Sequence, residues 1–289
     1  MNIKTNQEFQ DEIANNIFPN GIYAGVSNQD YHSSPGISKS GLDLINKSPA
    51  HYQFATPRKP SAAMHIGTAV HTAILEPELF KRDYMLLENI DDKRKSEYKE
   101  AVKQFGKENV LIKQEASMIK GIQESINANP AASNLLNQEG YAELSFFATD
   151  ENGILLKCRF DFLTESGLAI DLKTTQDASP YGFSKSTNEY RYHVQHAFYN
   201  HVYMLVTGNP LLSFVFLATE KESPFFNKPY TLTRESLEIG NYYMRKNLSA
   251  YTESAKTGHW PMPDNNLEEL DLPSWAINQY EEEIEGEIK

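Results

Sequence analysis

Hydrophobic and polar positions follow a helical period over some parts of this chain and a strand period over others. Residues 62–80 are apolar on nearly all sides, which predicts a buried helix. Residues 141–174 instead form short β-rich runs separated by turn sequences, which predicts a meander. The order of elements predicts an α/β or α+β fold, with one sheet flanked by helices. The predicted helices are 38–46, one starting at Ser48-Pro49, 62–80, the charged stretch 91–128, 189–206 and 233–256, and the predicted strands are 141–149, 154–164, 168–174 and 211–219.

The length and composition fit one globular domain with a short segment at each end. The 289 residues are 40% hydrophobic and 23% charged, which is enough to bury a substantial core. No apolar run approaches the roughly 20 residues of a membrane span, and the first residues lack the apolar stretch of a secretory signal, so we expect a cytoplasmic protein with no membrane partner. We expect a loosely held polar arm at residues 1–20, one domain at 21–262 and an acidic tail at 263–289.

Charge is distributed unevenly along the chain. The net charge is −12, whereas a protein that binds nucleic acid normally has a basic surface. Residues 264–289, however, contain nine acidic residues and one basic residue, which leaves only −4 for the rest of the chain. The acidic tail can therefore hide a basic groove elsewhere, so the net charge does not exclude DNA.

The sequence excludes an iron–sulfur cluster and gives only weak support for a zinc site. Cys158 is the single cysteine, so the chain forms no disulfide framework and no iron–sulfur cluster, which would need about four thiolates. His193 and His196 form an H-x-x-H pair on a predicted helix, but a structural zinc usually needs four ligands. We therefore do not expect zinc there.

Two strands of the predicted meander carry carboxylates that can face each other. In the strand 168–174, Asp171 and Lys173 share one face, and a tight turn at 165–167 can place Asp161 on the same face. Two carboxylates that close repel each other unless a cation lies between them, and Mg²⁺ prefers such oxygen ligands. The alternative is that these are solvated faces of antiparallel strands. In the strand 154–164, alternation places Leu156, Cys158, Phe160 and Phe162 on one face, and Lys157, Arg159 and Asp161 on the other.

The spacing of these residues resembles the PD-(D/E)xK nuclease superfamily, in which a carboxylate precedes Asp-x-Lys by about ten residues on paired strands. Gln195-x-x-x-Tyr199 on the next helix resembles an element of RecB-type nucleases, and His71 in Gly67–His71 resembles their metal-binding histidine. Together, the matching segments are similar to the nuclease domain of RecE-type exonucleases (exodeoxyribonuclease VIII) over residues 21–261. The matching segments are Tyr31-His32, Ile37–Tyr52, Met64–Pro77 and Ala169–Thr175.

The resemblance implies a restriction-endonuclease-like core, a central mixed sheet flanked by helices, and roles for individual residues. Asp161, Asp171, His71 and the backbone carbonyl of Leu172 would bind one or two catalytic Mg²⁺ ions, for which Mn²⁺ would substitute. Lys173 would orient or deprotonate the attacking water and offset phosphate charge. Gln195 and Tyr199 would position the scissile phosphate or the lysine.

Further residues are assigned to the site with a second interpretation left open. Glu143, on the first strand of the meander, is either a catalytic carboxylate or an exposed strand residue. Ser38, Lys39 and Ser40 at a helix amino terminus would bind DNA phosphate, and simple helix capping explains them equally well. Tyr192 shares a helix face with Gln195 and is placed with the DNA-binding residues.

The resemblance also implies an activity and partners. We expect a 5′→3′ exonuclease on linear double-stranded DNA ends that leaves 3′ overhangs, a tetrameric ring, and a RecT-like single-strand annealing protein as partner, in a phage or prophage context. An endonuclease or single-strand nuclease of the same superfamily, and a DNA-end-binding protein without cleavage, are the alternatives. A structural phage protein is disfavoured because several motifs occur together in the right order.

Overall fold

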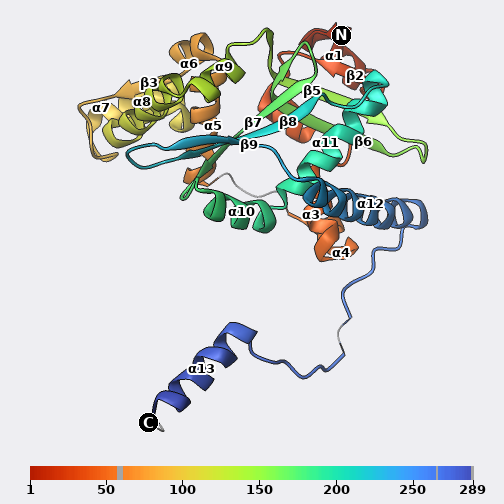
Figure 1. Ribbon diagram of the computed structural model, residues 1–289. Helices are drawn as coiled ribbons and strands as arrows, with labels where there is room; N and C mark the ends of the chain where they lie inside the picture. The colour runs from red at the N-terminus through yellow and green to blue at the C-terminus, as the bar shows by residue number, and fades with distance from the viewer. Residues whose placement is uncertain (57–60, 265, 288–289) are drawn as a thin grey trace.

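The computed structural model describes residues 1–56, 61–264 and 266–287, and its centre is a seven-stranded mixed sheet (Figure 1). β1 and β2 are parallel, the pairs from β2 to β7 are antiparallel, β7 and β8 are parallel, and β9 is antiparallel to β8. The predicted fold class, one mixed sheet with helices on its faces, is confirmed. In order across the sheet, the strands are β1 (Ile3–Lys4), β2 (Gly21–Tyr23), β5 (Gly140–Thr149), β6 (Leu155–Thr164), β7 (Leu168–Thr175), β8 (Ser213–Glu220) and β9 (Asn227–Tyr230).

One face of the sheet is covered by helices from both halves of the chain. Phe198 of α11 and Met244 of α12 pack with Leu42 of α3 into a single buried cluster that includes Phe160 and Phe216 of the sheet. This cluster joins residues that are far apart in sequence, and it forms the larger core. The helices on this side are α3 (Lys39–Lys47), α4 (Pro49–Gln53), α10 (Pro180–Glu189), α11 (Tyr192–Thr207) and α12 (Arg234–Thr257).

The opposite face is covered by the segment between the first helices and the meander. Val70 of α5 and Ile122 of α8 pack against Leu172 and Leu217 of the sheet. A small two-stranded sheet, β3 with β4, extends this helical layer away from the centre (Figure 1). The elements here are α5 (Ala62–Leu75), α6 (Pro77–Asp83), β3 (Met85–Leu87), α7 (Ser96–Phe105), a short 3₁₀ turn (Lys107–Asn109), β4 (Val110–Ile112), α8 (Lys113–Ala128) and α9 (Pro130–Leu136).

The apolar run at residues 211–219 forms β8, which is buried on both faces. Phe214 and Phe216 pack in the core with α11, whereas Val215 and Leu217 pack in the core with α5 and α8. A strand covered on both sides needs apolar residues at every position, so it shows no alternation. The prediction of a buried strand is confirmed here, with β8 beginning at Ser213.

Three predicted helices are each divided in two. The stretch 62–80 breaks at Glu76, because Pro77 cannot continue α5 and instead begins α6. The stretch 91–128 contains α7 and α8 with β4 between them. The predicted helix 189–206 spans the end of α10 and the whole of α11, which are separated by Tyr190 and Arg191.

Residues 1–20 do not form the loosely held arm that their polarity predicts. β1 pairs with β2, and α1 (Asn6–Ala14) inserts Phe9, which is 1% exposed, against Tyr23 and Phe147. The hydroxyl of Tyr23 donates to Glu12, which also binds Lys4. A few apolar anchors in a polar segment are therefore enough to fix it to the edge of the sheet.

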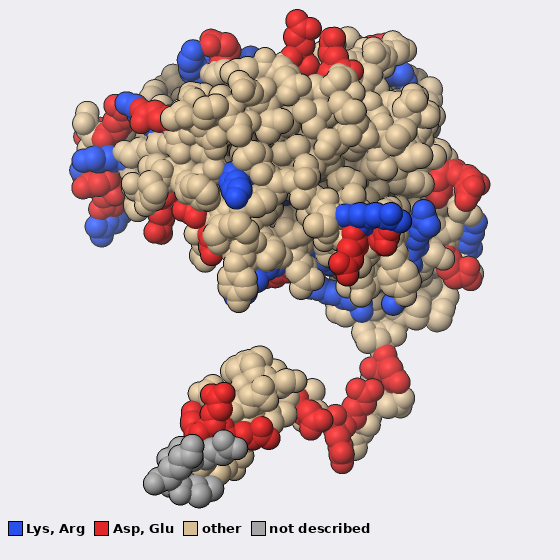
Figure 2. Space-filling model, viewed as in Figure 1, with Lys and Arg blue, Asp and Glu red and all other residues tan. Residues whose placement is uncertain are grey.

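The acidic tail leaves the body after α12 and ends in α13 (Ser274–Glu287) (Figure 1). Figure 2 shows acidic side chains along the tail. Residues 265, 288 and 289 of the predicted tail lie outside the described residues. Among the described helices, none combines the length and the apolar character that crossing a membrane requires.

Candidate active site

β6 and β7 stop pairing at the two residues that carry the predicted carboxylates. Beyond the pair Phe162–Ile170, the register of β6 and β7 would set Asp161 opposite Asp171. The N–H of Leu172 donates instead to Oδ2 of Asp161, at 2.8 Å. A side chain thus takes the place of a neighbouring strand, and both carboxylates lie at the point where the β6–β7 ladder ends.

Asp171 is buried between two partners. The residue is 3% exposed, its Oδ2 lies 2.6 Å from Nζ of Lys173, and its Oδ1 accepts a hydrogen bond from Nε2 of Gln195 at 2.5 Å. Burial raises the pKa of Asp171 to about 6, although the Lys173 charge opposes this. Burial also opposes the charge of Lys173, but the carboxylates of Asp171 and Asp161 outweigh it and raise the pKa of Lys173. The ammonium is therefore held as a cation at neutral pH.

Donor atoms from three elements converge beside this pair. His71 of α5, Glu143 of β5 and Asp161 of β6 each place one donor atom so that all three lie within 4.8 Å of one another. Nδ1 of His71 is 3.4 Å from Oδ2 of Asp161. One imidazole and two carboxylates suit Mn²⁺ or Mg²⁺, so these residues fit a divalent cation. Asp171 and the Leu172 carbonyl are not in this group, and their role as metal ligands stays a prediction.

Glu143 has an unusual backbone and a perturbed acidity. Its φ is +49°, a left-handed conformation that is uncommon for residues other than glycine and often marks a functional site. Burial, followed by the charge of Asp161, raises the pKa of Glu143 to about 8, and Arg159 opposes this shift. Two neighbouring, half-buried carboxylates resist ionising together, so a bound divalent cation would relieve their repulsion. Of the two interpretations left open for Glu143, the geometry favours a site residue.

The alternation of side chains changes face at this position. In β6, Phe160 packs in the core with α11 and α12, whereas Phe162 packs in the core with α5 and α8. The prediction that Phe162 shares a face with Phe160 is therefore wrong. In β5, Ala142 and Leu144 differ in the same way. Glu143, the left-handed residue between them, reverses the face to which the side chains of β5 point. The paired residues of β6 change face at the same place.

α11 presents three of the predicted residues, and they occupy different environments. Gln195 binds Asp171, as described above, and Nζ of Lys173 lies 4.8 Å from the ring centroid of Tyr192. Tyr199 packs edge-to-face against Phe160, with ring centroids 5.2 Å apart. Tyr192, and not Tyr199, therefore lies against the lysine, and the predicted role of Tyr199 at the phosphate stays a prediction.

The start of α3 carries the predicted phosphate contacts. Ser38 is the N-cap residue, but its side chain makes no capping hydrogen bond; its Oγ lies 2.9 Å from Oγ of Ser40. Nζ of Lys39 donates to the carbonyl of Tyr190 and pairs with Asp43 at 2.7 Å. Capping by the Ser38 side chain thus does not explain this residue, and DNA binding by the three residues stays a prediction.

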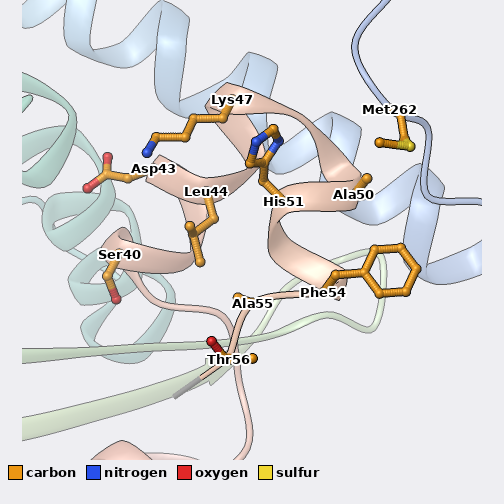
Figure 3. Close-up of a pocket in the computed structure, with 10 residues that line it drawn as sticks. All are labelled: Ser40, Asp43, Leu44, Lys47, Ala50, His51, Phe54, Ala55, Thr56 and Met262. Carbon is orange, nitrogen blue, oxygen red and sulfur yellow. The ribbon is translucent and has the colours of Figure 1, made fainter. Parts of the chain in front are cut away.

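A cavity of about 740 Å³ lies beside α3 and α4 (Figure 3). Ser40 and Asp43 line one end of it, and His51, Phe54 and Met262 line other parts. None of its lining residues belongs to the donor group of His71, Glu143 and Asp161. We therefore place the chemistry at the β6–β7 junction and not in this cavity.

Two cations beside the site are buried, which sequence reasoning missed because it placed them only on the strand face opposite the apolar residues. Lys157 is 5% exposed and Arg159 is 7% exposed. Nη1 of Arg159 is 3.9 Å from Oε2 of Glu143. Both cations bind the segment around α2 (Asn28–Ser33) to the sheet. Their burial could have been predicted only from the knowledge that β6 is a central strand. Arg159 donates to Ser145, Asn28 and Val26, and Lys157 donates to the carbonyls of Tyr31, His32 and Ser34.

The H-x-x-H pair on α11 shows no metal-site geometry. Nδ1 of His193 lies 3.4 Å from the carbonyl of Thr187, and His196 packs beside the ring of Phe214. Within the described part of the chain, neither histidine belongs to a group of three donors.

Comparisons with known proteins agree with this geometry. A family model described as a PDDEXK-like domain of unknown function (DUF3799) matches residues 38–272. The crystal structure of a protein from Eubacterium rectale, described as a "Putative exonuclease", is similar with a TM-score of 0.58 and 14% identity, covering 87% of this chain and 97% of that one. The crystal structure of SSO0001 matches with a TM-score of 0.28 and 12% identity, over 72% of this chain and 84% of that one, too weakly to support an argument. No curated protein sequence matches this chain.

Proposed function

Because the chain belongs to the family of PDDEXK-like domains that matches residues 38–272, we propose that it is a divalent-cation-dependent nuclease that degrades linear double-stranded DNA from its ends. The observation that carries the proposal is the β6–β7 junction. There Asp161 and Asp171 flank the end of one strand ladder, and Lys173 is held against Asp171. The similar fold of the protein from E. rectale adds support for a nuclease.

Each residue of the junction has a task that its contacts support. A divalent cation held by His71, Glu143 and Asp161 would supply Lewis acidity and a nucleophilic water at neutral pH. Lys173, charged and fixed by Asp171, orients that water or offsets the charge that develops on the phosphate. Gln195 fixes the other oxygen of Asp171, so the lysine keeps one position.

The finer features of the proposal rest on the resemblance to RecE-type exonucleases. They are Mg²⁺ as the working ion with Mn²⁺ as a substitute, 5′→3′ polarity with 3′ overhangs, a tetrameric ring, a RecT-like annealing partner and a phage or prophage origin. In a ring, only the channel lining must be basic, which is compatible with the net charge of −12.

The experiment uses a linear duplex labelled separately at its 5′ and 3′ ends, with a covalently closed circle of the same sequence as control. The proposal predicts early release of the 5′ label as mononucleotide, only with Mg²⁺ or Mn²⁺ and only from the linear DNA. Cleavage of the circle would favour an endonuclease. Binding of the duplex without any cleavage would favour an end-binding protein.

A further inference from the structure

An aromatic ladder runs from the active-site lysine to the surface of the protein. Tyr192, whose ring lies 4.8 Å from Nζ of Lys173, stacks on Phe216 inside the core, with ring centroids 5.5 Å apart. On its outer side it stacks with Tyr190, at 5.8 Å and an interplanar angle of 27°. Tyr190 is 54% exposed, so its ring ends the ladder in solvent.

The backbone fixes this ring in a strained connection. Tyr190 follows α10 as its C-cap residue, and the next residue, Arg191, has a left-handed φ of +54° before α11 begins. Such a conformation costs energy in a residue other than glycine, and it persists only where its surroundings enforce it. Lys39 of α3 contributes to that enforcement by donating from Nζ to the carbonyl of Tyr190. The backbone of Tyr190 is therefore fixed by the left-handed Arg191 that follows it and by its hydrogen bond from Lys39.

Two cations flank the ladder. Nη1 of Arg191 binds Asp43 at 2.9 Å, whereas its Nη2 is buried without a hydrogen-bond partner among the described residues. Lys39 pairs with the same carboxylate and lies close enough to Lys173 for the two charges to repel. Two cations share one carboxylate here, so Asp43 balances only one of the two positive charges beside Tyr190, and the side chain of each cation is 15% exposed.

We propose that the exposed ring of Tyr190 is a stacking platform for a nucleobase of an unpaired DNA strand beside the active site, with Lys39 and Arg191 facing its backbone phosphates. An exposed aromatic ring with adjacent cations is the arrangement by which proteins bind single strands without sequence preference. The inference rests on the proposed nuclease function and deepens it: the substrate at the site is an unpaired, frayed end and not a closed base pair.

The test places 2-aminopurine at the terminal unpaired position of a DNA duplex and measures its fluorescence on binding, in EDTA so that no cleavage occurs. The wild type and Tyr190→Phe are expected to quench the fluorescence, whereas Tyr190→Ala leaves it unquenched and binds the frayed end about 10-fold more weakly. Tyr181→Ala is the matched control, because Tyr181 is a 70% exposed tyrosine of α10 that stacks with Lys185 and lies outside the ladder. This variant is expected to behave as the wild type.

A second measurement uses only the wild type and changes the DNA, so its result does not depend on whether a variant folds. Removing the terminal unpaired base, to leave an abasic end, is expected to weaken binding by the wild type by a similar factor. Equal quenching by Tyr190→Ala, or equal affinity for the abasic end, overturns the inference. If the wild type cleaves duplex in Mg²⁺ but shows no quenching, the inference alone fails. If it neither binds nor cleaves, the proposed function fails as well.

Discussion

The β6–β7 junction and the C-terminal tail show opposite ways of placing charge. At the junction, Asp171 is 3% exposed and each of its oxygens contacts a partner. In the tail, acidic residues alternate with apolar ones that stay in solvent, such as Leu270 at 97% and Trp275 at 70% exposure. Buried charge is costly unless partners hold it, so it marks a fixed site, whereas solvated charge specifies no geometry. The total of −12 therefore says less about function than a few buried groups do.

The largest effect is expected from the lysine of the junction. Under the proposed function, Lys173→Met removes the cation that would face the phosphate and should lower the rate of DNA cleavage by about 10³-fold, the scale of losing one electrostatic contact in a transition state. Gel-based cleavage assays and circular dichroism measure rate and folding together. The matched control is Lys185→Met, a lysine outside the junction that stacks on Tyr181. Full activity in Lys173→Met would refute the assignment.

A second effect concerns stability around the two buried cations. Arg159→Met leaves Ser145, Asn28 and the carbonyl of Val26 without their donor. Above pH 8, where Glu143 is ionised, it also leaves that carboxylate without a cation, so the free energy of unfolding at pH 8.5 should fall by about 3 kcal/mol. Lys157→Met removes a cation from the same strand face. Among the described residues its hydrogen bonds go only to backbone carbonyls and the Ser34 hydroxyl, so its loss should cost less. Urea unfolding of both variants gives the comparison. A larger loss for Lys157→Met would contradict our view that the charge of Glu143 matters.

A third effect is a pH dependence of stability without metal. The folded-state pKa of Glu143 is about 8 and that of Asp171 about 6, both raised above the values of free carboxyls. The folded state therefore binds protons more tightly than the unfolded chain, and stability falls as the pH rises from about 4.5 to about 8. A divalent cation at His71, Glu143 and Asp161 would replace the proton of Glu143, so Mg²⁺ should raise the melting temperature by roughly 5 °C more at pH 8.5 than at pH 5.5. A pH-independent shift would argue against this donor set.

The smallest effect is expected from removing the tail. The described residues from 266 to 284 are largely exposed, so truncation after Asp264 should change the melting temperature by less than about 1 °C and leave the cleavage rate unchanged. Differential scanning fluorimetry and the same cleavage assay measure both. A large loss of stability would show that the tail packs on the body, which would remove the contrast between the two regions.

Local sequence patterns predicted most of the sheet, because turn residues and alternation are local properties. β6, β7 and β8 lie close to their predicted limits. Asp161, Asp171 and Lys173 come together as strand alternation predicted, and His71 and Gln195 join them as the resemblance to RecB-type nucleases implied. The left-handed conformation of Glu143 and the resulting change of face in β5 and β6 were not predictable, because they depend on tertiary packing.

Two further features were missed for the same reason. Phe9 fixes a polar segment that looked unstructured, and its partners lie in β2 and β5. Lys157 and Arg159 are buried because their strand is central and covered by the segment around α2, which no local pattern reveals. Charge on a strand can therefore be read as solvated or buried only after the position of the strand in the sheet is known.

The central claim is that the residues at the β6–β7 junction hydrolyse DNA with a divalent cation. The most direct measurement is single-turnover cleavage of a linear duplex by the wild type and by Asp161→Asn, in Mg²⁺, in Mn²⁺ and in EDTA, with binding measured in parallel. We predict nucleotide release by the wild type with either metal, none in EDTA, and none by the bound variant. Binding of the duplex without hydrolysis by the wild type in both metals would contradict the claim.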